Sequence, residues 1–187
     1  MLYYWAFMIT RMTDKKAITI LLFLQLLLFL VVQPGGNFPL NDDWAYSHSA
    51  IWLGEEGRIR LSHWIAPNIV PQTLLGGSLS MLFGFSFEFL RHLNQCISLL
   101  AALAAFALFR AGRLTPPHAL VGCVVLIAMP SWSVLANSYM TDLYGLLFGL
   151  AAAALFLRAL DRGSVSLVAA ATVVVCIGML QRQVLLV

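Results

Sequence analysis

Charged residues are scarce in this sequence. Only 10% of the 187 residues are Asp, Glu, Lys or Arg, whereas 61% are apolar and the mean hydropathy is +0.88. Soluble domains contain about 25% charged residues, so a water-soluble fold is excluded because a chain of this length cannot bury so much apolar surface. The basic residues occur in short clusters, which excludes the concentrated basic patch of a nucleic-acid-binding protein. We therefore expect an integral membrane protein whose partner is the lipid bilayer, with no nucleic acid.

Cysteine is also scarce. Cys96, Cys123 and Cys176 all fall inside apolar stretches, and no pair has metal-ligand spacing. Thiols in different hydrocarbon spans are poorly placed for a disulfide, so we interpret them as small core residues. His48 and His63 have no partner at the usual spacing of zinc ligands, so a metal site built on them is not favoured.

Long apolar runs predict an all-α polytopic membrane protein with five transmembrane helices in one domain, because a span needs roughly 20 apolar residues. The predicted spans are residues 17–33, 92–109, 118–136, 143–160 and 166–181. The first run has a basic front like a signal peptide, but no convincing cleavage site follows it, which favours a retained span. The chain stops inside an apolar stretch, so we expect residues 1–187 to be a fragment of a longer protein.

The basic residues predict the orientation. By the positive-inside rule, the N-terminus and the two short basic loops lie in the cytoplasm. The residues that carry this signal are Lys15, Lys16, Arg110, Arg113, Arg158 and Arg162. Residues 34–91 then form an outer loop. Residues 71–90 are apolar enough to be a sixth span, but that would place Arg110 and Arg113 outside, so we favour an interfacial helix.

Two adjacent carboxylates, Asp42 and Asp43, follow the first span beside Trp44 and Tyr46. Tryptophan and tyrosine alone would anchor an interface, so the carboxylates need another explanation. One of them could act as a general base or bind a divalent cation that holds a phosphate. The competing interpretation is a solvated loop in which Asn41 or Asp42 caps the next helix. The motif alone favours neither.

Asp142 and Arg182 lie on the same predicted outer side. Asp142 begins the fourth span, where the helix dipole alone would favour an acidic residue. Two separated acidic sites at one face of a weakly charged membrane protein nevertheless indicate function. Arg182, between Gln181 and Gln183, could bind a lipid phosphate through its guanidinium or extend to the outer headgroups.

The order of several short motifs is informative. They are Asp42-Asp43-Trp44-Ala45-Tyr46, Met81-Leu82-Phe83-Gly84-Phe85-Ser86, Arg91-His92-Leu93-Asn94, Pro130-Ser131 and Met140-Thr141-Asp142. In this order they resemble the polyprenyl-phosphate-dependent glycosyltransferases with the GT-C fold, in particular the protein O-mannosyltransferase and aminoarabinose-transferase-like branch. That family more often has Asp-Glu than Asp-Asp in the first motif, and its members are much longer.

The resemblance implies a glycosyltransferase in the bacterial inner membrane that transfers a sugar from a polyprenyl-phosphate donor to a lipid, glycan or protein acceptor. It implies that Asp42, with Asp43 and Asp142, belongs to the catalytic site, and that Tyr46 and Arg182 bind substrate. It leaves open the sugar, the acceptor and any divalent metal. The alternative is a transporter or another non-enzymatic membrane protein. Transporters tend to place charges near the bilayer midplane on broken helices, often in repeated halves, whereas here the acids lie at span ends.

Overall fold

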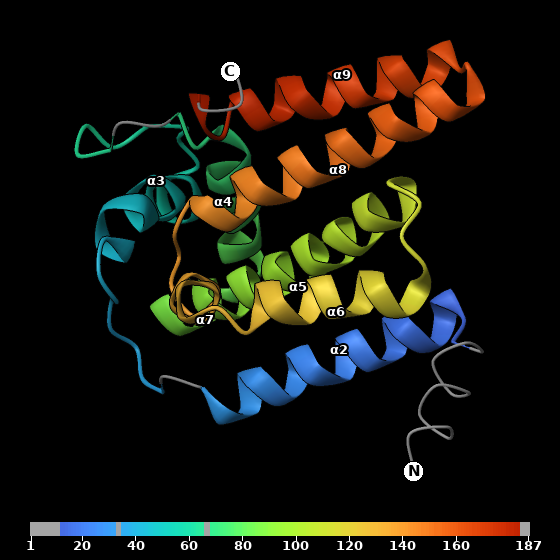
Figure 1. Ribbon diagram of the computed structural model, residues 1–187. Coiled ribbons are helices and arrows are strands. Elements are labelled where there is room, and N and C mark those ends of the chain that lie inside the picture. The colour runs from blue at the N-terminus through green and yellow to red at the C-terminus, as the bar shows by residue number, and fades with distance from the viewer. Residues whose placement is uncertain (1–11, 33–34, 66–67, 184–187) are drawn as a thin grey trace.

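The computed structural model describes residues 12–32, 35–65 and 68–183. These residues form helices joined by turns and loops, with no strand among them, which confirms the all-α prediction. The helices are α2 (Asp14–Val31), α3 (Asp43–Glu56), α4 (Val70–Phe83), α5 (Phe87–Ala111), α6 (Pro116–Ile127), α7 (Pro130–Ala136), α8 (Asp142–Arg162) and α9 (Val165–Met179). Figure 1 shows α2, α5, α6, α8 and α9 running side by side, with α3, α4 and α7 gathered at one end of them.

Two of the helices are long and apolar enough to cross a membrane by themselves. These are α5, with 25 residues, and α8, with 21 residues. They also pack against each other more extensively than any other helix pair. Small residues on α5, including Ala101 and Ala105, are fully buried and allow neighbouring helices to approach closely.

The predicted span 118–136 is not a straight helix. The chain bends by 72° between α6 and α7, just before Pro130. Proline has no N–H to continue the helix and disfavours helical geometry in the residue before it, so a new helix begins there. Counted as one broken span, α6 and α7 give a third candidate crossing.

The first and last predicted spans are shorter or more polar than expected. Helix α2 has 18 residues, but Asp14, Lys15 and Lys16 form its first turn. Helix α9 has only 15 residues, or about 22 Å at 1.5 Å per residue, against a hydrocarbon layer of about 30 Å. The described residues therefore contain two or three candidate spans, and the predicted count of five is not confirmed.

Residues 71–90 do not form a single helix. Helix α4 ends at Phe83, Gly84 has a φ of 83°, and α5 begins at Phe87 after Ser86 accepts a hydrogen bond from the Phe89 N–H at 2.9 Å. Helix α4 has 14 residues, or about 21 Å, which is too short for a straight crossing. It packs on α3 at the end of the molecule (Figure 1), and an interfacial position for it stays a prediction.

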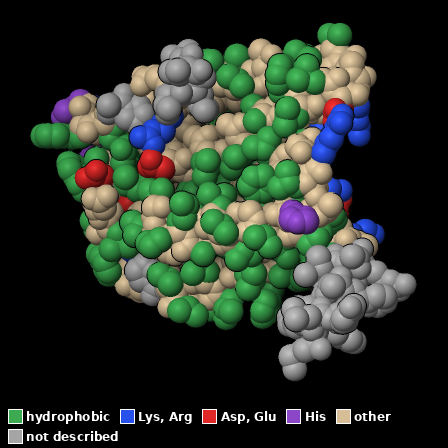
Figure 2. Space-filling view, in the orientation of Figure 1, with side chains coloured by type: hydrophobic (Ala, Val, Ile, Leu, Met, Phe, Trp, Pro, Cys, Tyr) green, Lys and Arg blue, Asp and Glu red, His purple; other side chains and the backbone are tan. Residues whose placement is uncertain are grey.

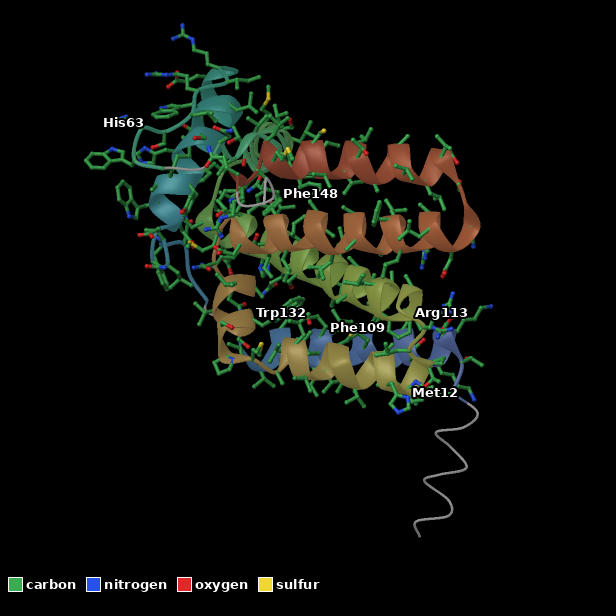
Figure 3. All side chains as sticks on the ribbon, turned by 45° about the horizontal axis from the view of Figure 1, so that its top comes forward. Met12, His63, Phe109, Arg113, Trp132 and Phe148 are labelled. Atoms are coloured by element: carbon green, nitrogen blue, oxygen red, sulfur yellow. The ribbon has the colours of Figure 1, made fainter. Side chains whose placement is uncertain are left out.

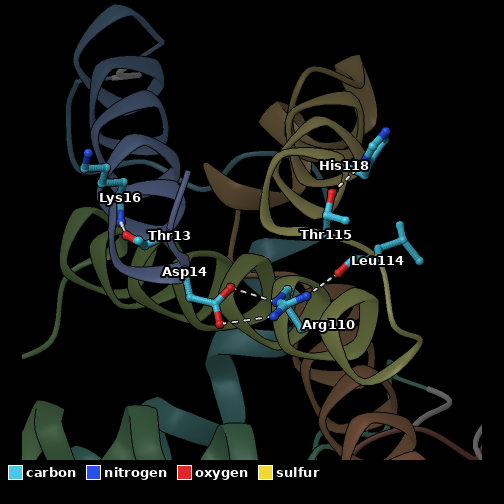
Figure 4. A network of polar contacts seen from close by, with 7 residues as sticks. All are labelled: Thr13, Asp14, Lys16, Arg110, Leu114, Thr115 and His118. Carbon is cyan, nitrogen blue, oxygen red and sulfur yellow. Dashed lines mark hydrogen bonds and ion pairs between the residues drawn. The ribbon is translucent and has the colours of Figure 1, made fainter. Parts of the chain in front are cut away.

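The two ends of the long helices differ in polar chemistry. At one end Arg110 pairs with Asp14 at 2.7 Å and also donates to the Leu114 carbonyl, joining the start of α2 to the end of α5 (Figure 4). At the same end Arg113 pairs with Asp161 of α8 at 2.8 Å. Figure 2 shows Lys and Arg side chains gathered there. All the short basic connections that predicted the orientation thus share one end of the bundle.

Candidate functional site

The opposite end of the bundle carries the acidic residues singled out from the sequence. Asp42 is the N-cap residue of α3, and its side chain makes no capping hydrogen bond. This exposed carboxylate is therefore not used to satisfy the N–H groups at the start of the helix, which was the structural alternative considered for it. It faces outward from the first turn of α3 and is accessible to a ligand.

Asp43 differs from its neighbour because its side chain is fully buried. One carboxylate oxygen accepts a hydrogen bond from the Leu40 N–H at 3.3 Å. Burial raises the pKa of Asp43 from 3.8 to about 6, against the lowering effects of the Leu40 and Tyr139 backbone N–H groups and of the Arg91 charge. Asp43 thus supports the loop before α3 rather than facing a substrate.

Tyr46 lies one helical turn after Asp42 and joins the site to two distant segments. Burial raises the pKa of its phenol, and the negative charges of Asp42 and Asp142 raise it further, whereas Arg182 and the Thr141 hydroxyl lower it. The phenol therefore lies within the electrostatic influence of Asp42, Asp142 and Arg182. The start of α3, the start of α8 and the residues after α9 therefore converge at one place.

Arg182 and Asp142 form an ion pair within this cluster. The Arg182 side chain is 35% exposed and that of Asp142 is 32% exposed, so both charges remain partly accessible. The aliphatic part of Arg182 lies along the first turn of α8, since a methyl group at Gly145 would be 3.5 Å from the Arg182 Cδ. A guanidinium in this position can bind an anion while Asp142 holds it in place.

The position of Arg182 is fixed by its neighbour Gln181. The Gln181 side chain is fully buried and exchanges two hydrogen bonds with Gln72: its Oε1 accepts from the Gln72 N–H at 3.0 Å, and its Nε2 donates to Gln72 Oε1 at 2.7 Å. The backbone N–H of Val70 also donates to the Leu180 carbonyl at 3.0 Å. The unpaired N–H groups at the start of α4 thus meet the carbonyls at the end of α9.

A buried polar network under the site was not identified as a site in the sequence analysis. Asn94 donates to the carbonyls of Leu135 at 2.6 Å and Ser138 at 2.5 Å, and Gln95 donates to Asn137 at 2.7 Å. This network fixes the α7–α8 connection, which carries Tyr139 to Asp142, on top of α5. The sequence feature that indicates this network is the run of polar residues, including Asn94 and Gln95, near the start of an otherwise apolar span.

Arg91, on the same turn of α5, is 2% exposed. It donates to the carbonyls of Gly36 and, at 3.0 Å, Phe38, and lies over the Phe38 ring at 5.2 Å. The guanidinium therefore fastens the loop before α3 to the bundle. Arg91 and Asn94 both position the loops that carry the acidic residues.

A cavity of about 590 Å³ lies beside Asn41, the residue before Asp42. Its walls are formed by Val31 and Val32 at the end of α2, by Val134 of α7, and by Asn41 and Asn137. The apolar walls suit a hydrocarbon chain, and the amides lie where a polar head could bind. In the described part of the chain, no group of three or more His, Cys, Asp and Glu residues is placed to hold a metal ion.

The structure therefore brings together Asp42, Tyr46, Asp142 and Arg182 at one end, with Asp43 buried directly beneath the loop. No family model, curated protein or solved structure matches this chain.

Proposed function

We propose that this chain forms the outer-face site of a glycosyltransferase that uses a polyprenyl-phosphate sugar donor, built on a GT-C-like fold. The observation that supports the proposal most strongly is the convergence of Asp42, Tyr46, Asp142 and Arg182 from three distant segments. An accessible carboxylate, a neutral phenol and a partly exposed guanidinium are the groups that a transfer from a phosphate donor to a hydroxyl needs.

In this proposal Asp42 is the base. The oxygen of an acceptor hydroxyl attacks the anomeric carbon, the bond between that carbon and the phosphate oxygen breaks, and the hydroxyl proton passes to Asp42. Polyprenyl phosphate leaves with the bonding electron pair. Arg182 binds the phosphate and stabilises its additional negative charge, while Asp142 orients the guanidinium. Asp43 is a positioning residue, because no substrate reaches its buried carboxylate.

The cavity beside Asn41 offers a place for the lipid chain of a substrate. It is open and mostly apolar, and Asn41, which precedes Asp42 in the sequence, contributes a polar group to its wall. A lipid substrate entering from the bilayer would place its head next to Asp42 without leaving the hydrophobic layer entirely. This supports a lipid-linked substrate over a fully water-soluble one.

The test is release of polyprenyl phosphate by the purified full-length protein from a panel of polyprenyl-phosphate sugars. Asp42→Asn should lower the rate at least about a hundredfold, because general-base catalysis contributes that much or more. Asp161→Asn, at the opposite end, is the matched control and should retain the wild-type rate. Wild-type rates in Asp42→Asn would remove Asp42 from the mechanism.

The orientation has its own test. We propose that the basic end faces the bacterial cytoplasm and the acidic cluster faces outward across the inner membrane. Single cysteines at Arg113 and His63, which lie at opposite ends of the molecule (Figure 3), should react with a membrane-impermeant thiol reagent only from the inside and only from the outside, respectively. The reverse pattern would place the site in the cytoplasm.

One observation favours a transporter as the second candidate. The α6–α7 span is broken by 72°, close to Trp132 and Asp142, and broken helices commonly line substrate sites in transporters. Asp142-dependent uptake into proteoliposomes, without release of polyprenyl phosphate from any donor, would support this function and exclude the transferase.

A further inference from the structure

Helix α3 presents a stripe of aromatic rings on the face that does not pack against the bundle. Trp44, His48 and Trp52 are spaced four residues apart, so they lie on one side of the helix. Their rings are in contact, with centroids 6.0 Å apart for Trp44 and His48 and 5.7 Å apart for His48 and Trp52. The packed face of α3 is made instead by small and aliphatic residues such as Ala50 and Leu53.

The loop after α3 adds further rings to this stripe. Gly57, with a φ of 65°, ends the helix and turns the chain back, and the Arg58 N–H donates to the Trp52 carbonyl at 3.2 Å. The Ser62 N–H then donates to the buried Ser49 Oγ at 3.0 Å, which fastens the returning loop to α3. The loop is thereby held in one position on the helix.

As a result Trp64 lies beside Trp44, with centroids 6.0 Å apart and ring planes tilted by 58°. His63 lies against Trp64 at 5.2 Å, and the Arg60 guanidinium covers Trp52 at 4.8 Å. The two tryptophans form a V-shaped surface bordered by groups that can donate hydrogen bonds. The Ser49–Ser62 hydrogen bond positions the loop that carries Trp64.

These rings are exposed although they are large and apolar. Trp44 is 40% exposed and Trp64 is 66% exposed. Contiguous exposed aromatic surface in a folded protein usually marks a binding site. The stripe is therefore a candidate surface for a ligand that stacks on indole rings.

The position of the stripe favours a ligand from water over the bilayer. Figure 3 shows His63 at the extreme end of the molecule, beyond the ends of the long helices and opposite Arg113. A tryptophan belt that anchors a membrane protein lies around the spans at the depth of the headgroups. Rings that project beyond the spans would stand in the aqueous layer instead.

We propose that Trp44 and Trp64 bind the pyranose rings of a carbohydrate acceptor, with His48 and His63 hydrogen bonding to its hydroxyls. The apolar C–H face of a pyranose stacks on an aromatic ring, and its edge hydroxyls need polar partners. The stripe begins two residues after Asp42, so a glycan lying along α3 would reach the acidic cluster. The binding surface stands without the proposed function; only its role as an acceptor site depends on that function.

The test uses the full chain in lipid nanodiscs with cellohexaose and maltohexaose as probes, followed by titration calorimetry. We expect the wild type to bind at least one of them, Trp64→Ala to bind about tenfold more weakly, and Trp64→Phe to retain most of the affinity. Phe156→Ala removes an exposed ring from α8 and is the matched control, which should bind like the wild type.

Absence of binding to both probes by folded protein, or unchanged binding by Trp64→Ala, would overturn the proposal. Quenching of Trp44 and Trp64 fluorescence by lipids with brominated chains would also overturn it, because it would place the rings in the bilayer. If the wild type binds the probe and transfers no sugar from any donor, the proposed function fails while this binding surface stands.

Discussion

Replacing the buried Asp43 with Asn should change how the stability of the protein depends on pH. The carboxyl lies fully buried beneath the loop before α3, where burial raises its pKa from 3.8 to about 6. A raised pKa means that between these values the folded state binds more protons than the unfolded state. The free energy of unfolding therefore falls as the pH rises from about 4 to about 6, and the loss is complete above that range.

The magnitude follows from the same difference. One pKa unit corresponds to about 1.4 kcal/mol, so ionised Asp43 destabilises the folded state by about 3 kcal/mol at neutral pH. Asn cannot ionise, and its side-chain oxygen can still accept the Leu40 N–H. The free energy of unfolding of Asp43→Asn should thus rise by about 3 kcal/mol relative to that of the wild type between pH 4 and pH 8. This change is expected whether the variant is more or less stable than the wild type at pH 4.

The assay is reversible unfolding in mixed micelles of dodecyl maltoside and SDS, followed by circular dichroism at several pH values. Subtracting the free energy of unfolding of one protein from that of the other cancels the contribution of all other carboxylates. Asp161→Asn, on an acid with a 45% exposed side chain, is the control. The reasoning would be refuted if the difference in the free energy of unfolding between wild type and Asp43→Asn stayed constant from pH 4 to pH 8. A difference that shifts in favour of the wild type at high pH would also refute it.

Three further predictions concern the stability of the fold. Gln72→Leu should destabilise the fold by about 1–3 kcal/mol by leaving the buried Gln181 Nε2 without its acceptor, whereas the backbone N–H of residue 72 still donates to Gln181 Oε1. Replacing both Gln72 and Gln181 with Leu should cost less than the sum of the two single replacements in the same unfolding assay. Gly76→Ala would place a methyl group against the Tyr139 hydroxyl, closer than van der Waals contact allows, so it should lower the midpoint of unfolding, and adding Tyr139→Phe should restore part of the loss. Arg110→Ala, at the opposite end, should cost no more than about 1 kcal/mol because its ion pair is partly exposed; a larger loss would contradict that estimate.

The helical class and the polarity of the two ends could be predicted from the sequence. Apolar runs of this length in a weakly charged chain indicate a membrane protein, and in the bilayer only structures that satisfy their own backbone hydrogen bonds are stable. The alternation of spans predicted that the basic loops lie at one end of the molecule and that Asp42 and Asp142 both lie at the other. The number of crossings could not be predicted, because a continuous apolar run such as 118–136 does not reveal that Pro130 starts a new helix at a 72° bend.

The roles within the site depended on long-range packing. Asp42 and Asp43 have the same chemistry and adjacent positions, yet one is exposed and the other fully buried, because consecutive residues of a helix point in different directions and only the neighbouring elements determine which direction is the interior. Likewise, the spacing of Trp44, His48 and Trp52 could be recognised in the sequence, whereas the addition of Trp64 required the turn at Gly57 and the Ser49–Ser62 hydrogen bond. Local periodicity thus specified the helices and the faces they carry, and contacts between residues far apart in the chain determined which of those faces meet.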